Sequence, residues 1–359
     1  MQCIENKFSI FDNNSDIVGF NNELKAQYLN YYHNKYKKNL LYVSSSLFEA
    51  NKLYQALQNY NANVLLFPMD DFLTSEALAI SPELKITRLE TLNELINNNK
   101  PTIVVTNLLG FLRFLPNKSL YRDSNISLKK NVDFEISQLI ATLCILGYQK
   151  ESTVSKTGEF AVRGFVIDVF PISYTNPVRI EFWGDTVDSI REFDVNTQLT
   201  INNKLDSVTI NPNTEFLTTK QVDTFDLKQR DLINYEKPVS IYNYLEDSLL
   251  FYDNYDQIQV NYEQLTKEMF DYTVSNDLSK DTKYMFSLDE FVNVKHINFS
   301  NFDVTANKNS YKIQELESIK GNINKLEDTL KSYILKGNTV ILCVSNRYKV
   351  NKLIDELHI

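Results

Sequence analysis

The chain has 359 residues, which is too long for one simple hydrophobic core and predicts two or three domains. Its formal net charge of −9 argues against a general affinity for nucleic acid, because such affinity needs a clustered positive surface. Hydrophobic residues make up 43%, enough to fill several cores, yet no apolar run approaches the roughly 20 residues that span a bilayer. The first residues lack the basic and apolar segments of a signal peptide, so we expect a cytoplasmic protein.

The cysteines and histidines are few and scattered. Cys3, Cys144 and Cys343 stand far apart, and the last two lie in apolar runs, so we expect reduced, buried thiols. The three histidines are equally dispersed, which predicts no metal site.

Residues 18–118 alternate short apolar runs with segments of helical spacing. Strands are predicted at 40–43, 64–67 and 103–106, and helices at 47–57 and 82–96. Serines at 44–46 and at 81 are suited to cap these helices. Continuous apolar strands separated by helices predict a parallel sheet covered on both faces, and therefore an α/β fold.

A sheet of this kind raises the question of nucleotide hydrolysis, which needs glycines that wrap phosphates, a lysine and a hydroxyl for magnesium. The chain has eight glycines and no Gly-Lys pair, and the segment 19–25 has one glycine and no hydroxyl in register. Asp70 and Asp71 resemble a magnesium-binding pair, but two acidic residues in a loop are usually solvated. We therefore expect no nucleotide cofactor and no catalytic residues in this chain.

A polar, charged stretch at 120–131 is typical of a domain border. After it, Asp133 is expected to cap a helix that ends at Gly147. The apolar residues of this helix share one face. They are Ile136, Leu139, Ile140, Leu143 and Leu146.

Residues 158–198 are dominated by β-branched and aromatic residues and are interrupted by turn formers, which predicts three or four strands of a small antiparallel sheet. Within 177–184, apolar residues alternate with Arg179, Glu181 and Trp183, so one face should be buried. An arginine beside a tryptophan on the other face is the composition of a binding hot spot. A second interpretation stays open, in which Trp183 covers the rim of its own sheet and Arg179 pairs with Glu181 or with a neighbouring strand.

These residues also form a long motif that resembles the UvrB-homology region of the bacterial transcription-repair coupling factors, the Mfd family. The resemblance runs from Arg163 to Gln198. The segments that match the family motif are Arg163-Gly164, Ile167-Asp168-Val169-Phe170-Pro171, Arg179-Ile180-Glu181-Phe182, Gly184-Asp185 and Asp188-Ser189-Ile190-Arg191. The sequence departs from the family at Phe165, where Gly or Ala is usual, and at Trp183, where Phe is usual.

The resemblance implies that the parallel sheet is a degenerate RecA-like lobe and that the antiparallel sheet belongs to an inserted α/β domain that docks UvrA, the damage-recognition ATPase of nucleotide-excision repair. The docking residues would be Arg163, Arg179 and Trp183. Alternation does not orient Arg163, because Gly164 can introduce a bulge. The implied function is recruitment of UvrA to stalled RNA polymerase without ATPase activity. The alternative, a UvrB-type or helicase-type ATP-dependent repair enzyme, is disfavoured by the glycine count.

The remaining expectations concern the later part of the chain. Strands are predicted at 208–211 and 248–252, and loops with edge strands between 271 and 300. Helices at 323–335 and 347–357 would flank a strand at 339–344, which alone cannot bury both faces and therefore predicts the start of a further domain. The resemblance to the coupling factors implies that RNA polymerase and DNA are bound by domains beyond residue 359. The expected domain ranges are 1–120 and 201–333 for the lobe, 121–200 for the insert and 334–359 for the incomplete domain.

Overall fold

The computed structural model describes residues 8–60, 63–71, 81–98, 100–219, 228–300, 322–342, 344 and 346–357. The chain divides into two compact units, 1–306 and 307–359. No helix in these described ranges is long and apolar enough to cross a membrane. The four expected domain ranges stay a prediction.

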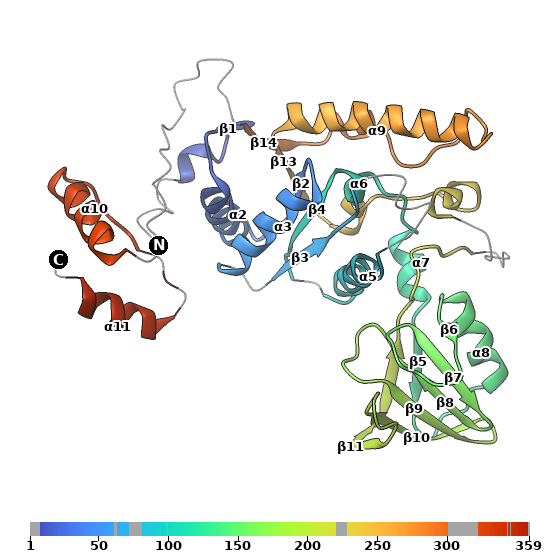
Figure 1. The fold of residues 1–359 in the computed structure, drawn as a ribbon. Helices are drawn as coiled ribbons and strands as arrows, with labels where there is room; N and C mark the ends of the chain where they lie inside the picture. The colour runs from blue at the N-terminus through green and yellow to red at the C-terminus, as the bar shows by residue number, and fades with distance from the viewer. Residues whose placement is uncertain are drawn as a thin grey trace. The chain divides into compact units, whose positions relative to one another are not determined.

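A six-stranded parallel sheet forms the centre of the larger unit, with strand order β1-β14-β13-β2-β4-β3. Its strands come from both ends of that unit's sequence, as the colours of Figure 1 show. The bounds are β1 (Asp16–Val18), β2 (Asn39–Ser44), β3 (Val64–Phe67), β4 (Ile103–Asn107), β13 (Ser248–Asp253) and β14 (His296–Ser300). The predicted α/β class and the predicted strands at 40–43, 64–67, 103–106 and 248–252 are confirmed.

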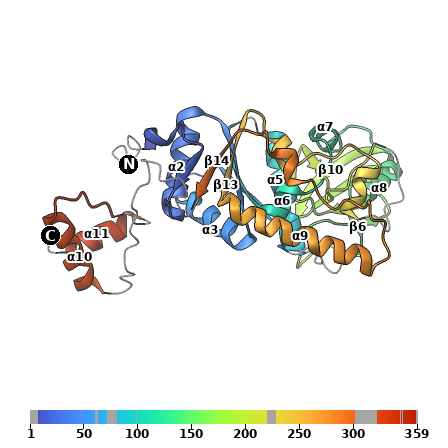
Figure 2. The ribbon, with the colours of Figure 1, turned by 90° about the horizontal axis from the view of Figure 1, so that it is seen from above.

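Helices follow most of these strands, and three of the helices begin at side-chain caps. Asn21, Ser46 and Ser81 each accept a hydrogen bond from the backbone N–H three residues later, which satisfies one of the free amides of a helix start. Figure 2 shows α9 as one long, unbroken helix. The helices are α2 (Asn22–Tyr36), α3 (Leu47–Gln58), α5 (Pro82–Asn97), α6 (Leu108–Leu112), α7 (Lys118–Asp123) and α9 (Tyr255–Ser275), with short 3₁₀ turns at Ser9–Phe11, Gln229–Asn234, Ile241–Tyr244 and Leu288–Phe291.

Two expectations for the end of this lobe are wrong. The stretch that begins at residue 271 contains the end of α9, and β14 is an interior strand between β1 and β13, whereas loops and edge strands were expected. Only three residues of α9 are fully buried, so the helix lacks the wide apolar stripe that identifies helices in a sequence.

The second sheet also has six strands, in the order β11-β10-β9-β8-β7-β6, and is antiparallel apart from the β6–β7 pair. It continues through β11, past the border expected at residue 200. A separate antiparallel pair, β5 with β12, joins the two ends of this inserted region. The bounds are β5 (Ile126–Lys129), β6 (Gln149–Lys150), β7 (Glu159–Arg163), β8 (Val166–Val169), β9 (Val178–Trp183), β10 (Thr186–Phe193), β11 (Thr200–Leu205) and β12 (Ser207–Ile210).

Helix α8 (Ile136–Ile145) packs its predicted apolar face against this sheet, and Gly147 follows its end with a left-handed φ of +81°. Two details differ from expectation. The N-cap is Glu135, because the Asp133 carboxylate instead accepts a hydrogen bond from Thr186 on β10. Cys144 is exposed and not buried as expected, whereas Cys3 and Cys343 lie outside the described residues.

A buried ion cluster ties the exit of the insert to the lobe. The Glu215 carboxylate is bound by Arg88 Nε of α5 at 2.6 Å and by Arg113 Nη2, just after α6, at 2.7 Å. Burial alone would raise the pKa of Glu215, but the charges of Arg113 and Arg88 outweigh it and hold the pKa at about 2. Asn213, two residues earlier, donates to the Gly147 carbonyl, so one short segment holds both regions.

The smaller unit contains α10 (Ile323–Leu335) and α11 (Arg347–Glu356), as predicted. The strand expected at 339–344 is absent from its described residues, 339–342 and 344. A strand needs a neighbour for its backbone hydrogen bonds, and the described residues of this unit supply none.

Candidate partner-binding site

The predicted alternation along β9 is confirmed. Val178, Ile180 and Phe182 are buried against the core that includes α8, and the other three residues of the strand point to the opposite, open face. Cross-strand register adds neighbours to this face: Asp168 pairs with Arg179, and Val166 pairs with Glu181. The open face therefore has an inner part around Arg179 and an outer part that ends at Trp183.

The inner part is occupied by the protein's own contacts. Both oxygens of Asp168 are bound by Arg179, at 2.7 Å from Nε and 2.9 Å from Nη2, in the forked geometry that suits guanidinium and carboxylate. The Arg179 guanidinium also lies 4.8 Å from the centre of the Phe193 ring, and its Nη1 donates to the Gln198 carbonyl. The hydrogen bonds to Asp168 raise the pKa of Arg179.

Arg179 consequently presents little of itself to a partner. Its side chain is 17% exposed and that of Asp168 is 1% exposed. The pairing with a neighbouring strand is the arrangement that the second interpretation of the sequence described. A direct docking role for Arg179 stays a prediction. Its contacts indicate a structural role, in which it holds β8, β9 and the 193–198 segment together.

Arg163 lies at the outer part of the open face. Its Nη2 donates to the Ser152 carbonyl at 3.2 Å, and its Nη1 is 3.9 Å from Asp168, yet its side chain is 47% exposed. The β7–β8 register is regular up to the Arg163–Val166 pair, so Gly164 makes a tight turn and no bulge. This settles the orientation that alternation left open, and it places Arg163 on the same face as Glu181 and Trp183.

Trp183 is the most exposed aromatic side chain in the described ranges, at 84%. It is the last residue of β9, before a turn in which Gly184 has a φ of +61°. The structure therefore contradicts the idea that Trp183 covers its own sheet. The strand that follows this turn, β10, is held in place because residues 131–134 make backbone hydrogen bonds to Asp185 and Val187.

One exposed aromatic residue of this region was missed as a site residue. Phe165, in the turn between β7 and β8, is 63% exposed, and its carbonyl accepts a 2.9 Å hydrogen bond from Phe182 N. The sequence marked Phe165 only as a departure from the family motif, because alternation assigns no direction to a turn residue.

In α/β proteins, nucleotides bind at the carboxyl ends of the parallel strands. Between β1 and α2, Asn21 caps the helix, and the Lys25 ammonium is bound to Asp253, at the end of β13, at 2.6 Å. The lysine beside this turn is thus engaged by a carboxylate of the protein itself.

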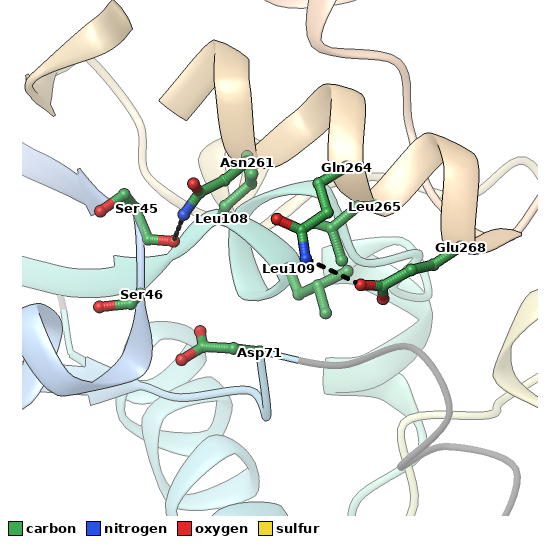
Figure 3. Close-up of a pocket in the computed structure, with 9 residues that line it drawn as sticks. All are labelled: Ser45, Ser46, Asp71, Leu108, Leu109, Asn261, Gln264, Leu265 and Glu268. Carbon is green, nitrogen blue, oxygen red and sulfur yellow. Dashed lines mark hydrogen bonds between the residues drawn. The ribbon is translucent and has the colours of Figure 1, made fainter. Parts of the chain in front are cut away.

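A small pocket of about 140 Å³ lies nearby, at the ends of β2 and β4 beneath α9. Figure 3 shows Asp71 on one side of it and the α9 side chains on the other. The Asp71 carboxylate accepts from Leu47 N, at the start of α3, at 2.7 Å, and burial raises its pKa. Asp71 is therefore a helix-capping residue and is not simply solvated, and with Glu268 it makes this pocket unsuited to a phosphate. No group of three or more potential metal ligands was found among the described residues.

Residues 126–216 match the family described as the UvrB interaction domain. This match spans β5 to the residue after Glu215, so it includes the whole antiparallel sheet and the buried carboxylate of the ion cluster.

Over almost its whole length the chain is similar to transcription-repair-coupling factors, which confirms the resemblance. It is 26% identical to that of Bacillus subtilis, over 94% of this chain and 34% of the relative. Identity to a Staphylococcus epidermidis factor is 25%, over 96% of this chain and 34% of the relative. Identity to a Staphylococcus haemolyticus factor reaches 33%, over 57% of this chain and 18% of the relative. The chain thus spans about a third of the length of the first two relatives.

Proposed function

We propose that this chain is the UvrA-recruiting module of a transcription-repair coupling factor and that it hydrolyses no nucleotide itself. The observation that carries the proposal is the outer part of the open face, where Trp183 is 84% exposed and Arg163 is 47% exposed on one side of one sheet. Tryptophan and arginine at the centre of an interface supply a large share of its binding energy.

The kind of partner follows from the domain and the relatives. A UvrB interaction domain within a protein similar to coupling factors is suited to hold UvrA near a stalled RNA polymerase. Contacts to RNA polymerase and to DNA belong, in this proposal, to other parts of the parent protein, whose activity as an ATP-driven DNA translocase is likewise a proposal.

The test uses Trp183, the single tryptophan of the chain. The free chain should emit as a hydrated indole, because the ring is exposed. Addition of a tryptophan-free UvrA fragment should shift the emission to the blue as the ring leaves water.

Trp183→Ala should weaken UvrA binding at least tenfold in a calorimetric titration, since a truncated hot-spot residue costs about 2 kcal/mol or more. Unchanged emission on saturation with UvrA, together with unchanged affinity of this variant, would refute the assigned docking face, and a free chain that binds no UvrA would refute the recruiting function.

A further inference from the structure

Phe165 protrudes from the insert without an evident folding role. It occupies the second position of the turn between β7 and β8, after Gly164, whose φ is +63°. In the described structure no atom other than those of the adjacent residues comes within 4 Å of a Cβ built on Gly164, so the space beside this position is open. The Phe165 side chain is 63% exposed, and truncating it would open no cavity in the core.

The Phe165 turn and the Trp183 turn lie side by side. Phe182 N donates to the Phe165 carbonyl at 2.9 Å, so the backbone of Phe165 contacts the residue just before Trp183. Antiparallel pairing of β8 with β9 brings both turns to the same end of the sheet. Each turn carries one large exposed aromatic residue at this end of the sheet, although one follows the other by 18 positions of sequence.

Single exposed apolar residues are ordinary on protein surfaces, but adjacent large ones mark sites of interaction. Here neither residue packs against another aromatic ring within the described ranges. The backbone beneath them is held by the β7–β8–β9 ladder and by the bonds of residues 131–134 to β10, so a partner would meet a preformed surface and would lose little ordering entropy.

The two charged residues beside the rings, Glu181 and Arg163, differ in how far their charges are compensated within the protein. Glu181 accepts a hydrogen bond from Ser189 and lies 3.6 Å from Arg191, so its charge is compensated within the sheet. Arg163 keeps about half of its side chain exposed on the same face. A complementary partner surface would therefore be apolar opposite the rings and would offer an acceptor or a carboxylate to Arg163.

We propose that Phe165 is a further contact residue at this end of the sheet and that, with Trp183, it anchors an apolar patch of UvrA that covers the two turns. This inference rests on the proposed function. It assigns the direct contacts to Phe165, Trp183 and Arg163, all at the same end of the sheet, and gives Arg179 a supporting role.

The experiment compares the full chain with its Phe165→Ala, Phe165→Leu and Trp183→Ala variants in calorimetric titrations with UvrA. Leu199→Ala is the matched control, because Leu199 is another exposed apolar residue, at 69%, whose bonds to neighbours use its backbone. Thermal unfolding of each variant verifies the fold.

Phe165→Ala should weaken UvrA binding at least tenfold, and Phe165→Leu, which keeps part of the apolar area, should weaken it less. Leu199→Ala should bind like the unchanged chain. If Phe165→Ala binds normally while Trp183→Ala is weakened, the inference is wrong and the proposed function stands. If Trp183→Ala also binds normally, this end of the sheet is not the docking surface, and if the unchanged chain binds no UvrA, the proposed function itself fails.

Discussion

Asp168 and Arg179 face each other across β8 and β9, and every oxygen of the carboxylate is bound by a separate nitrogen of the guanidinium, at 2.7 and 2.9 Å. Since Asp168 is almost completely buried, the pair cannot be separated without leaving a charge in an apolar environment. Arg179, which the family resemblance marks as a docking residue, is therefore part of the structural framework of the open face.

Arg179→Ala should destabilise the chain by about 3 kcal/mol, because it leaves Asp168 buried and largely uncompensated. Arg163→Ala, at an exposed site, should cost less than about 1 kcal/mol. Urea denaturation followed by circular dichroism measures both, and equal stabilities of the two variants would contradict the structural role of Arg179.

The ion cluster around Glu215 predicts a specific pH dependence. The pKa of this carboxyl is about 2 in the folded chain, below its ordinary value of 4.5, so its contribution to stability is complete above pH 4.5 and is lost as the pH falls toward 2. Between pH 6 and pH 3 this group should account for a loss of about 2 kcal/mol in the free energy of unfolding.

Glu215→Gln, which cannot titrate, should be less stable at pH 7 and should show a shallower decline over the same pH range. Urea unfolding at pH 6, 5, 4 and 3 gives both slopes. Parallel slopes would show that Glu215 is not the titrating group.

Gly158 and Gly184 form a matched pair for testing how the 213–215 segment is held. Both have positive φ, +87° and +61°, so alanine costs about 1 kcal/mol at either site through backbone strain. At Gly158 a Cβ would also lie 2.5 Å from Asn213 Nδ2, whereas at Gly184 the described structure places no atom within 4 Å.

Gly158→Ala should therefore lower the unfolding free energy by about 2 kcal/mol more than Gly184→Ala, since overpacking adds to the strain. Chemical denaturation of the two variants under one set of conditions measures the difference. An equal loss would mean that Asn213 moves aside without cost.

The chain should bind no ATP at physiological concentration. The lysine beside the β1–α2 turn is paired with Asp253, and the pocket under α9 contains Asp71 and Glu268, which would repel phosphate. Isothermal titration with ATP and magnesium should give no heat of binding. A micromolar dissociation constant would restore the alternative of an ATP-dependent repair enzyme.

The sequence predicted the parallel sheet well because β2, β3 and β4 each contain a continuous apolar run of three or four residues next to a capped helix. The prediction failed for elements whose own residues show only a weak pattern of burial or capping. β14 alternates half-buried and buried residues although it is interior, and Asn254, which precedes α9, has a left-handed φ of +57° and makes no side-chain cap.

The candidate site was predicted only in part, because the pattern of one strand does not show which other segments lie beside it. Alternation along β9 fixes the face of Arg179 and Trp183, but it cannot say what else lies on that face. Phe193 and Gln198 come from later in the chain and cover Arg179, while the outer end of the strand stays open. Phe165 lies in a turn, where the period of two no longer applies.

The strand order of the parallel sheet has a consequence for how the protein is made on the ribosome. β1 is bonded to β14 alone, and β2 receives its β13 neighbour only after the whole antiparallel insert has been synthesised. At the 5 to 20 residues per second typical of translation, the growing chain exposes these unpaired strand edges for on the order of ten seconds or more. During that interval the nascent lobe can pair wrongly with other strands, so its yield in the cell should depend on chaperones that shield edges until residues 248–300 have emerged.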